Sequence, residues 1–133
     1  MVGTFGYELD ITRISEEDRA QIPAQIADFK KYNPLVRTGD QYRLVNIFED
    51  GGFDAWMFVA KEKSRAVFTA VNVLGRPNYP TRRIRLAGLD PEKRYLSSDT
   101  NEVHTGAALM NCGIIIDLNG DFKSKVIEFT EEK

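Results

Sequence analysis

The chain has 133 residues, of which 42% are hydrophobic, and its 18 basic and 20 acidic side chains leave a formal net charge of −2 at pH 7. That length and composition suit one domain with a core of its own. The near balance of charge gives no long-range field that would attract nucleic acid or an anionic membrane, so neither partner is expected. One cysteine excludes an internal disulfide. With no leader and no long apolar run, a cytoplasmic location is expected.

The first predicted element is a helix that begins at Ser15. Serine is a favourable capping residue, and the three acids that follow it lie near the positive end of the helix dipole. Apolar residues at i, i+4 and i+7 form one face of this helix: Ile22, Ile26 and Phe29. We expect Asn33-Pro34 to end the helix. Pro23 predicts a kink, or a helix in two pieces, because an internal proline costs about 3 kcal/mol.

After Gly39 the hydrophobic pattern changes to period two, which predicts a series of short strands. These strands are expected around residues 42–44, 56–58, 67–73, 84–86, 114–116 and 125–129, with a single helical turn over 107–112. Strands that follow one another with little helix between them favour antiparallel pairing. The predicted fold class is therefore α+β, with an N-terminal helix followed by an antiparallel β-sandwich.

Two aromatic residues in one predicted strand suggest a sugar-binding surface. An aromatic ring packs well on the apolar face of a pyranose, and Trp56, with Tyr42 and Phe58, is the candidate for such a platform. Period-two spacing places Trp56 and Phe58 on the same face of the sheet. Burial of both side chains in the sandwich core is the preferred interpretation, so we assign no sugar-binding residue.

Glu8 and Asp10 are a possible carboxylate pair, because side chains two positions apart on a strand point the same way. A structural role at a strand-to-helix junction is the preferred interpretation. His104 is the only histidine and has no second histidine to share a metal, so we expect an exposed side chain at a strand end. Cys112 has no cationic neighbour in sequence and is expected to be a small core residue.

Asp117, Asn119 and Asp121 have the spacing of a calcium-binding loop. Phe122 stands where that loop requires glycine for its sharp turn. Asn119-Gly120 between apolar alternations instead predicts a hairpin turn. We therefore expect no metal site and no cofactor.

Four stretches of the chain form a set of motifs: Gly3-Thr4-Phe5-Gly6-Tyr7-Glu8-Leu9-Asp10-Ile11-Thr12, Ala55-Trp56-Met57-Phe58-Val59, Gly88-Leu89-Asp90-Pro91-Glu92-Lys93-Arg94-Tyr95 and Gly106-Ala107-Ala108-Leu109-Met110-Asn111-Cys112-Gly113. In these motifs the chain resembles the carboxy-terminal end of the bacterial α-galactosidases of glycoside hydrolase family 36. The resemblance implies that residues 1–36 are the terminal strand and helix of a missing catalytic barrel. It implies that residues 37–133 form a C-terminal antiparallel β-sandwich domain.

The resemblance also implies a function. The chain would be a non-catalytic fragment of an enzyme that removes terminal α-linked galactose from oligosaccharides such as melibiose and raffinose. In this family the catalytic nucleophile stands in a Lys-Trp-Asp sequence, which this chain lacks. We therefore expect no catalytic residue in the chain and no hydrolytic activity from the chain alone. The upstream barrel is the expected partner. Apolar residues that would lose their barrel neighbours also predict a homo-oligomer or a partly disordered amino terminus: Phe5, Tyr7, Leu9 and Ile11.

Two other classes of function stay open. A free-standing carbohydrate-binding module would need an aromatic platform exposed to solvent, and burial of Trp56 would remove its leading candidate. A small interaction or regulatory protein would have its amino-terminal segment ordered within the monomer.

Overall fold

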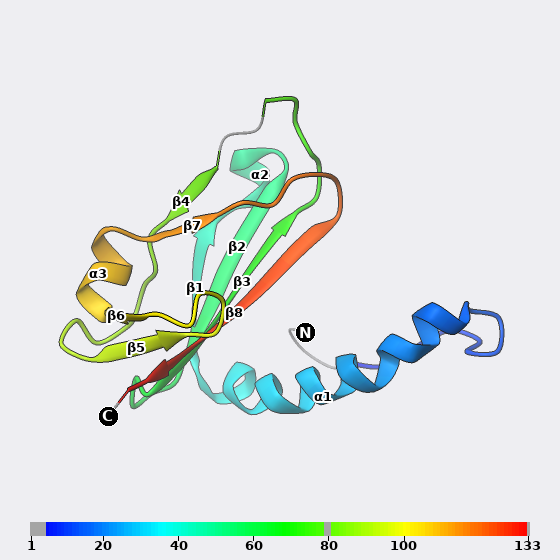
Figure 1. Cartoon of the computed structure of the whole chain (residues 1–133), viewed down its shortest axis with the longest axis horizontal. Coiled ribbons are helices and arrows are strands. Elements are labelled where there is room, and N and C mark those ends of the chain that lie inside the picture. The colour runs from blue at the N-terminus through cyan, green and yellow to red at the C-terminus, as the bar shows by residue number, and fades with distance from the viewer. Residues whose placement is uncertain (1–4, 79–80, 133) are drawn as a thin grey trace.

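The computed structural model describes residues 5–78 and 81–132; Gly3 and Thr4 of the amino-terminal motif lie outside this part. Figure 1 shows a long helix that extends away from a β-domain. The elements are α1 (Glu16–Thr38), β1 (Asp40–Val45), α2 (Ile47–Asp50), β2 (Phe53–Val59), β3 (Arg65–Asn72), β4 (Arg82–Ile84), β5 (Arg94–Ser97), β6 (Val103–Thr105), α3 (Gly106–Asn111), β7 (Ile114–Ile116) and β8 (Lys123–Glu131).

Helix α1 begins as the sequence predicts, because the Ser15 side chain accepts a hydrogen bond from the Asp18 amide at 3.0 Å. The predicted end at Asn33-Pro34 is wrong, since the helix continues to Thr38. Packing of the last two turns on the sheet offsets the backbone hydrogen bond that Pro34 cannot donate. The helix is one continuous element, so the two-piece alternative is also wrong. A kink at Pro23 stays a prediction.

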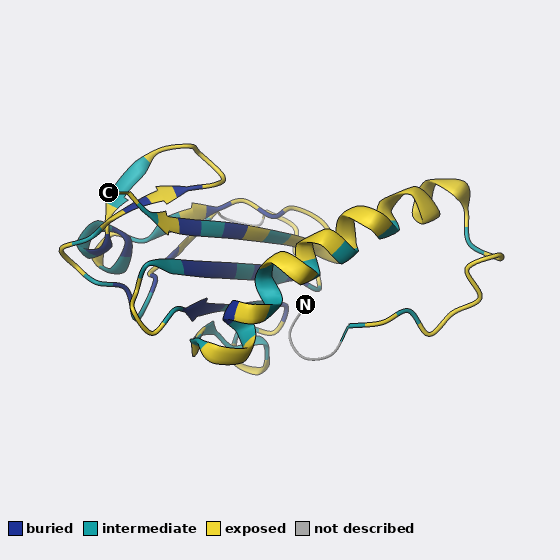
Figure 2. Cartoon of the chain, turned by 90° about the horizontal axis from the view of Figure 1, so that it is seen from below, coloured by how far each residue is buried: buried dark blue, intermediate teal, exposed yellow. Residues whose placement is uncertain are grey.

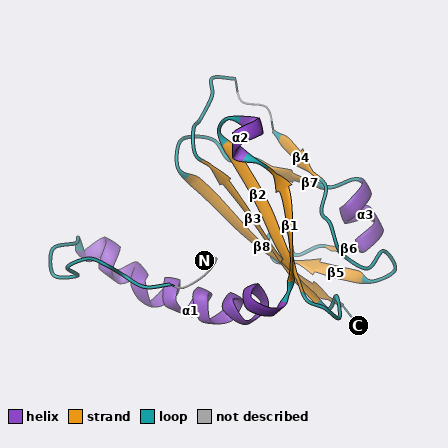
Figure 3. Ribbon diagram, turned by 180° about the vertical axis from the view of Figure 1, so that it is seen from behind, coloured by secondary structure: helices purple, strands orange, loops and turns teal. Residues whose placement is uncertain are grey.

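The strands of the described residues form two antiparallel sheets, which confirms the predicted α+β class. The large sheet has the order β1-β2-β3-β8-β5-β6, and β4 and β7 form the small one (Figures 1 and 3). Alternation along β2 sends Phe53, Ala55 and Met57 to one face of the large sheet. There they pack against Ile84 and Ile116 of the small sheet, so the core lies between the two sheets.

The connection between β7 and β8 differs from the prediction. Asn119-Gly120 was expected to close a hairpin, but β7 pairs with β4, whereas β8 pairs with β3 and β5. Residues 117–122 therefore cross from the small sheet to the large one. Gly120 has φ +96° and Phe122 has φ +54° in this crossing. The short elements α2, β5 and β6 were also absent from the predictions, whereas the helical turn predicted near 107–112 is confirmed as α3.

Within residues 5–78 and 81–132, no helix is both long and apolar enough to cross a lipid bilayer.

Candidate functional site

The last turns of α1 pack on the face of the large sheet that points away from the core. We call the apolar residues of this contact the outer-face cluster: Leu35, Phe58 and Val67 are buried in it, and Tyr32, Val36, Trp56 and Ala60 are partly buried around them. Figure 2 shows that α1 is buried only near the sheet and is exposed along its first turns. The helix is therefore held at one end.

A polar contact beside the outer-face cluster reinforces this attachment. The Glu128 carboxylate on β8 is only 11% exposed and accepts hydrogen bonds from Lys31 of α1 and from Arg65 of β3. The Arg65 guanidinium also donates to the Lys31 carbonyl oxygen at 3.4 Å. The hydrogen bond to Glu128 raises the pKa of Lys31. A largely buried carboxylate that joins two cations from different elements fixes the direction in which α1 leaves the sheet.

Trp56 belongs to this outer face and not to the main core, so its expected burial between the two sheets is wrong. Tyr42 lies on the adjacent strand β1, where it pairs with Met57 and packs against the main core on the opposite face of the sheet. The two aromatic residues therefore do not form one platform. The groove beside Trp56 encloses about 40 Å³, whereas ligand pockets usually enclose about 300 to 1,000 Å³.

The amino-terminal segment 5–14 runs back along α1 and contains no strand. Phe5 stacks on Phe29 of α1 with ring centroids 5.1 Å apart, and the Tyr7 hydroxyl donates to Gln25. A strand needs backbone partners on a neighbouring chain segment, and within residues 5–78 and 81–132 no strand pairs with this segment. The side chains of Leu9 and Ile11 remain 48% and 52% exposed. The segment therefore presents apolar residues that the described chain does not cover.

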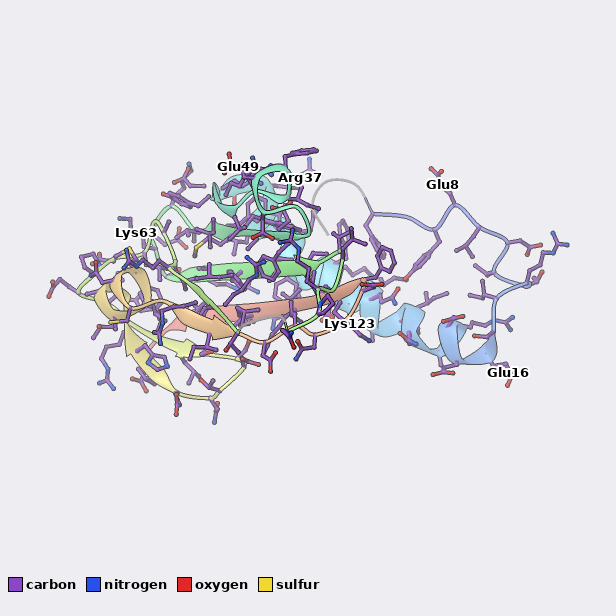
Figure 4. All side chains as sticks on the ribbon, turned by 90° about the horizontal axis from the view of Figure 1, so that it is seen from above. Glu8, Glu16, Arg37, Glu49, Lys63 and Lys123 are labelled. Carbon is purple, nitrogen blue, oxygen red and sulfur yellow. The ribbon has the colours of Figure 1, made fainter. Side chains whose placement is uncertain are left out.

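Glu8 and Asp10 lie in this irregular segment, so the strand on which their pairing depended is not formed. The Asp10 carboxylate accepts hydrogen bonds from the Thr12 hydroxyl at 2.6 Å and from the Thr12 amide at 3.0 Å, which lower the pKa of Asp10. Figure 4 shows the Glu8 side chain pointing away from α1. Asp10 thus stabilises a local turn, in agreement with the structural interpretation.

The three residues with the spacing of a calcium-binding loop form hydrogen bonds within the protein. Asn119 donates to Asp117 at 2.8 Å, and Asp121 accepts from the Gly75 amide at 2.6 Å. Among the residues that the structure describes, no three His, Cys, Asp or Glu side chains are grouped closely enough to hold a metal ion.

His104 and Cys112 meet at a cleft that the sequence did not predict. His104 lies in β6, and its imidazole Nε2 is 3.5 Å from a Glu102 oxygen. Cys112 follows α3 and is exposed, so its expected burial is wrong. It occupies the C-cap of α3, where the side chain faces outward from the core. Both residues line a cleft of about 330 Å³.

Comparison with known proteins decides the family. The model of the glycosyl hydrolase family 36 C-terminal domain matches residues 53–129, which is more than half of the chain. The chain belongs to glycosyl hydrolase family 36. A second model, melibiase, matches residues 1–39. The melibiase match ends just after α1, and the C-terminal domain match begins at the first residue of β2.

Relatives of this family 36 chain are similar to it over nearly its whole length. The α-galactosidase Mel36A of Lactobacillus acidophilus is 39% identical over 130 residues, which are 97% of this chain and 18% of the relative. The bifunctional α-galactosidase/sucrose kinase AgaSK of Mediterraneibacter gnavus is 37% identical over 134 residues, or 100% of this chain and 14% of the relative. The family 36 chain therefore spans less than a fifth of the length of these relatives.

Solved structures agree with the family 36 fold. The galactosidase domain of AgaSK superposes with a TM-score of 0.90 at 36% identity. The family 36 α-galactosidase AgaB from Geobacillus stearothermophilus superposes with a TM-score of 0.89 at 38% identity. Each comparison covers 96% of this chain and 18% of the solved chain.

Proposed function

We propose that this chain is the non-catalytic C-terminal β-domain of an α-galactosidase, an enzyme that hydrolyses terminal α-linked galactose in oligosaccharides such as melibiose and raffinose. The observation that carries the proposal is the change of family model along the chain: melibiase matches residues 1–39, and the family 36 C-terminal domain matches 53–129. In this proposal residues 1–36 complete a catalytic barrel, and residues 37–133 form the appended β-domain.

The proposed role is structural. The catalytic barrel packs on the exposed sides of α1 and on segment 5–14, where Leu9 and Ile11 lack cover. The outer-face cluster and the Glu128 ion pairs then hold the β-domain at a defined angle to that barrel. In the isolated chain, which lacks the barrel, the same exposed apolar residues favour association into a homo-oligomer. The single free cysteine suits a reducing compartment, which supports a cytoplasmic location.

Catalysis is assigned to the barrel and not to this chain. A retaining glycosidase needs two carboxyl groups about 5 Å apart, one as nucleophile and one as acid/base. Asp10 is engaged by Thr12 and Glu8 extends into solvent, which supports a chain without hydrolytic activity of its own. Trp56 receives no sugar-binding role, because its groove is too small for a pyranose ring.

A chimera tests the proposal. This chain replaces the aligned C-terminal part of the Lactobacillus acidophilus relative, and hydrolysis of p-nitrophenyl α-galactoside is measured for the chimera, for the relative truncated before that part and for this chain alone. We expect activity in the chimera, at least a tenfold loss in the truncated enzyme, and none in the isolated chain. A truncated enzyme as active and as stable as the intact one would contradict the structural role.

A pair of substitutions locates the contact with the barrel. Leu9→Asp with Ile11→Asp places two charges in the proposed interface, and we expect the chimera to lose most of its activity or to unfold at lower temperature. Leu74→Asp is the matched control, because Leu74 is similarly exposed at 53% and follows the end of β3, outside both segment 5–14 and α1. An interface variant that behaves like the control would contradict the proposed docking face.

A further inference from the structure

The cleft beside His104 lies between the β5–β6 hairpin, α3 and the small sheet. Its floor is made of apolar core residues, among them Leu109 of α3 and Ile127 and Phe129 of β8. Its volume of about 330 Å³ is at the lower end of the range for small-molecule sites, which is about 300 to 1,000 Å³. A ligand the size of one or two sugar rings would fill it.

The rim of the cleft carries both donors and acceptors of hydrogen bonds. Ser97 is buried, and its hydroxyl accepts from the Asp99 amide at 3.4 Å, which leaves the hydroxyl proton free to be donated. The Thr100 hydroxyl accepts from the Glu102 amide at 3.3 Å and has the same freedom. The Glu102 carboxylate is 67% exposed and adds acceptor oxygens. A ligand hydroxyl, which both donates and accepts, matches such a mixed rim.

The charges around the cleft are largely compensated. Asp99 forms an ion pair with Lys125 at 2.7 Å. Arg83 and Glu102, which carry opposite charges, both line the cleft, and Arg83 donates to the Cys112 carbonyl oxygen at 3.0 Å. The cleft therefore contains no unbalanced charge that would select an anion or a cation. We propose that this cleft is a binding site for a neutral polyhydroxylated ligand of one or two sugar rings.

This site is separate from the proposed barrel contact. Ile127 and Phe129 point to the core face of β8, whereas Val126 and Glu128 point to the outer face, where α1 is attached. The cleft elements α3, β5 and β6 also lie at the opposite end of the molecule from the first turns of α1 (Figure 1). A barrel packed on α1 would leave the cleft open, so the site does not depend on the proposed function.

The composition of the chain provides two reporters for the test. The sequence contains one histidine and one tryptophan; His104 lines the cleft, and Trp56 lies on the outer face of the sheet. We would follow the His104 imidazole and the Trp56 indole by NMR while the 133-residue chain is titrated with melibiose up to tens of millimolar. The proposal expects a saturable shift at His104 and none at Trp56. A shift at Trp56 alone, or at neither residue, would overturn it.

Charged ligands of the same shape test whether the cleft selects a neutral ligand. Galacturonate and galactosamine replace neutral galactose in the same titration, and we expect galactose to bind at least as tightly as either charged analogue. Tighter binding of a charged analogue would overturn the assignment to a neutral ligand. Alkylation of Cys112 by N-ethylmaleimide gives a second readout, since an occupied cleft slows the reaction in proportion to its occupancy.

Substitutions at the rim of the cleft test whether the ligand binds there. Glu102→Ala and Thr100→Ala each remove one exposed hydrogen-bonding group, and we expect each to weaken binding about five- to tenfold. Glu16→Ala is the matched control, because Glu16 is exposed on the first turn of α1, far from the cleft (Figure 4). An unchanged Trp56 signal verifies that each variant is folded. Binding that both rim variants retain at full strength would overturn the site.

Discussion

Replacement of Leu35 tests whether α1 is held to the sheet only by its last turns. Leu35 is 7% exposed and is the residue of α1 (Glu16–Thr38) that is buried. A Leu→Ala change in a protein core costs about 2 to 5 kcal/mol. Four neighbours of Leu35 are themselves only partly buried, so the space left by the side chain can be reached by solvent. We therefore expect the lower part of that range, about 2 to 3 kcal/mol, for Leu35→Ala.

Urea unfolding measures this loss in two ways. Trp56 fluorescence reports on the outer-face cluster, and circular dichroism reports on the whole chain. In Leu35→Ala we expect the fluorescence transition to move to a lower urea concentration than the circular dichroism transition, because the helix end leaves the sheet first. Ile26→Ala, on the part of α1 beyond the sheet contact, is the control and should cost less than about 1 kcal/mol. Equal losses in both variants, or coincident transitions in Leu35→Ala, would refute the reasoning.

Two further predictions concern the packing beneath α3. A Cβ atom at Gly106 would lie 1.9 Å from the Asp90 carbonyl oxygen, so Gly106→Ala should lower the free energy of unfolding in urea by more than about 2 kcal/mol; a neutral effect would contradict that contact. Burial raises the pKa of Tyr95, so its stabilising contribution is complete below about pH 10 and is lost as the pH rises through the folded-state pKa. Tyr95→Phe should therefore flatten the fall in melting temperature above pH 10, leaving a residual slope from Lys31, whose pKa is also raised; an unchanged profile would contradict the assignment.

Local patterns were sufficient to predict most of the secondary structure. The Ser15 cap and the period-two alternations around β2, β3 and β8 depend on neighbours within a few residues, and these predictions are confirmed. The resemblance to family 36 was likewise carried by contiguous motifs. The end of α1 was predicted wrongly for a related reason. A sequence rule stops a helix at Asn33-Pro34, whereas packing of Leu35 on the sheet favours about one more turn, to Thr38.

Each error about the site concerns a residue whose exposure depends on how distant parts of the chain pack. Cys112 has apolar neighbours in sequence, yet it faces outward at the end of α3. Trp56 has the spacing of a core residue, yet its face of β2 is the one that α1 covers. Period-two alternation shows that two faces exist but does not show which face meets the second sheet.

The sequence by itself determined where most helices and strands form and which family the motifs resemble, because both depend on short-range pattern. Only the tertiary structure decided which strands pair across the 117–122 crossing, which sheet face α1 covers and that a cleft forms from residues between 83 and 129. These features depend on the choice of partner among several strands with similar alternation. That choice is made by the packing of the whole chain.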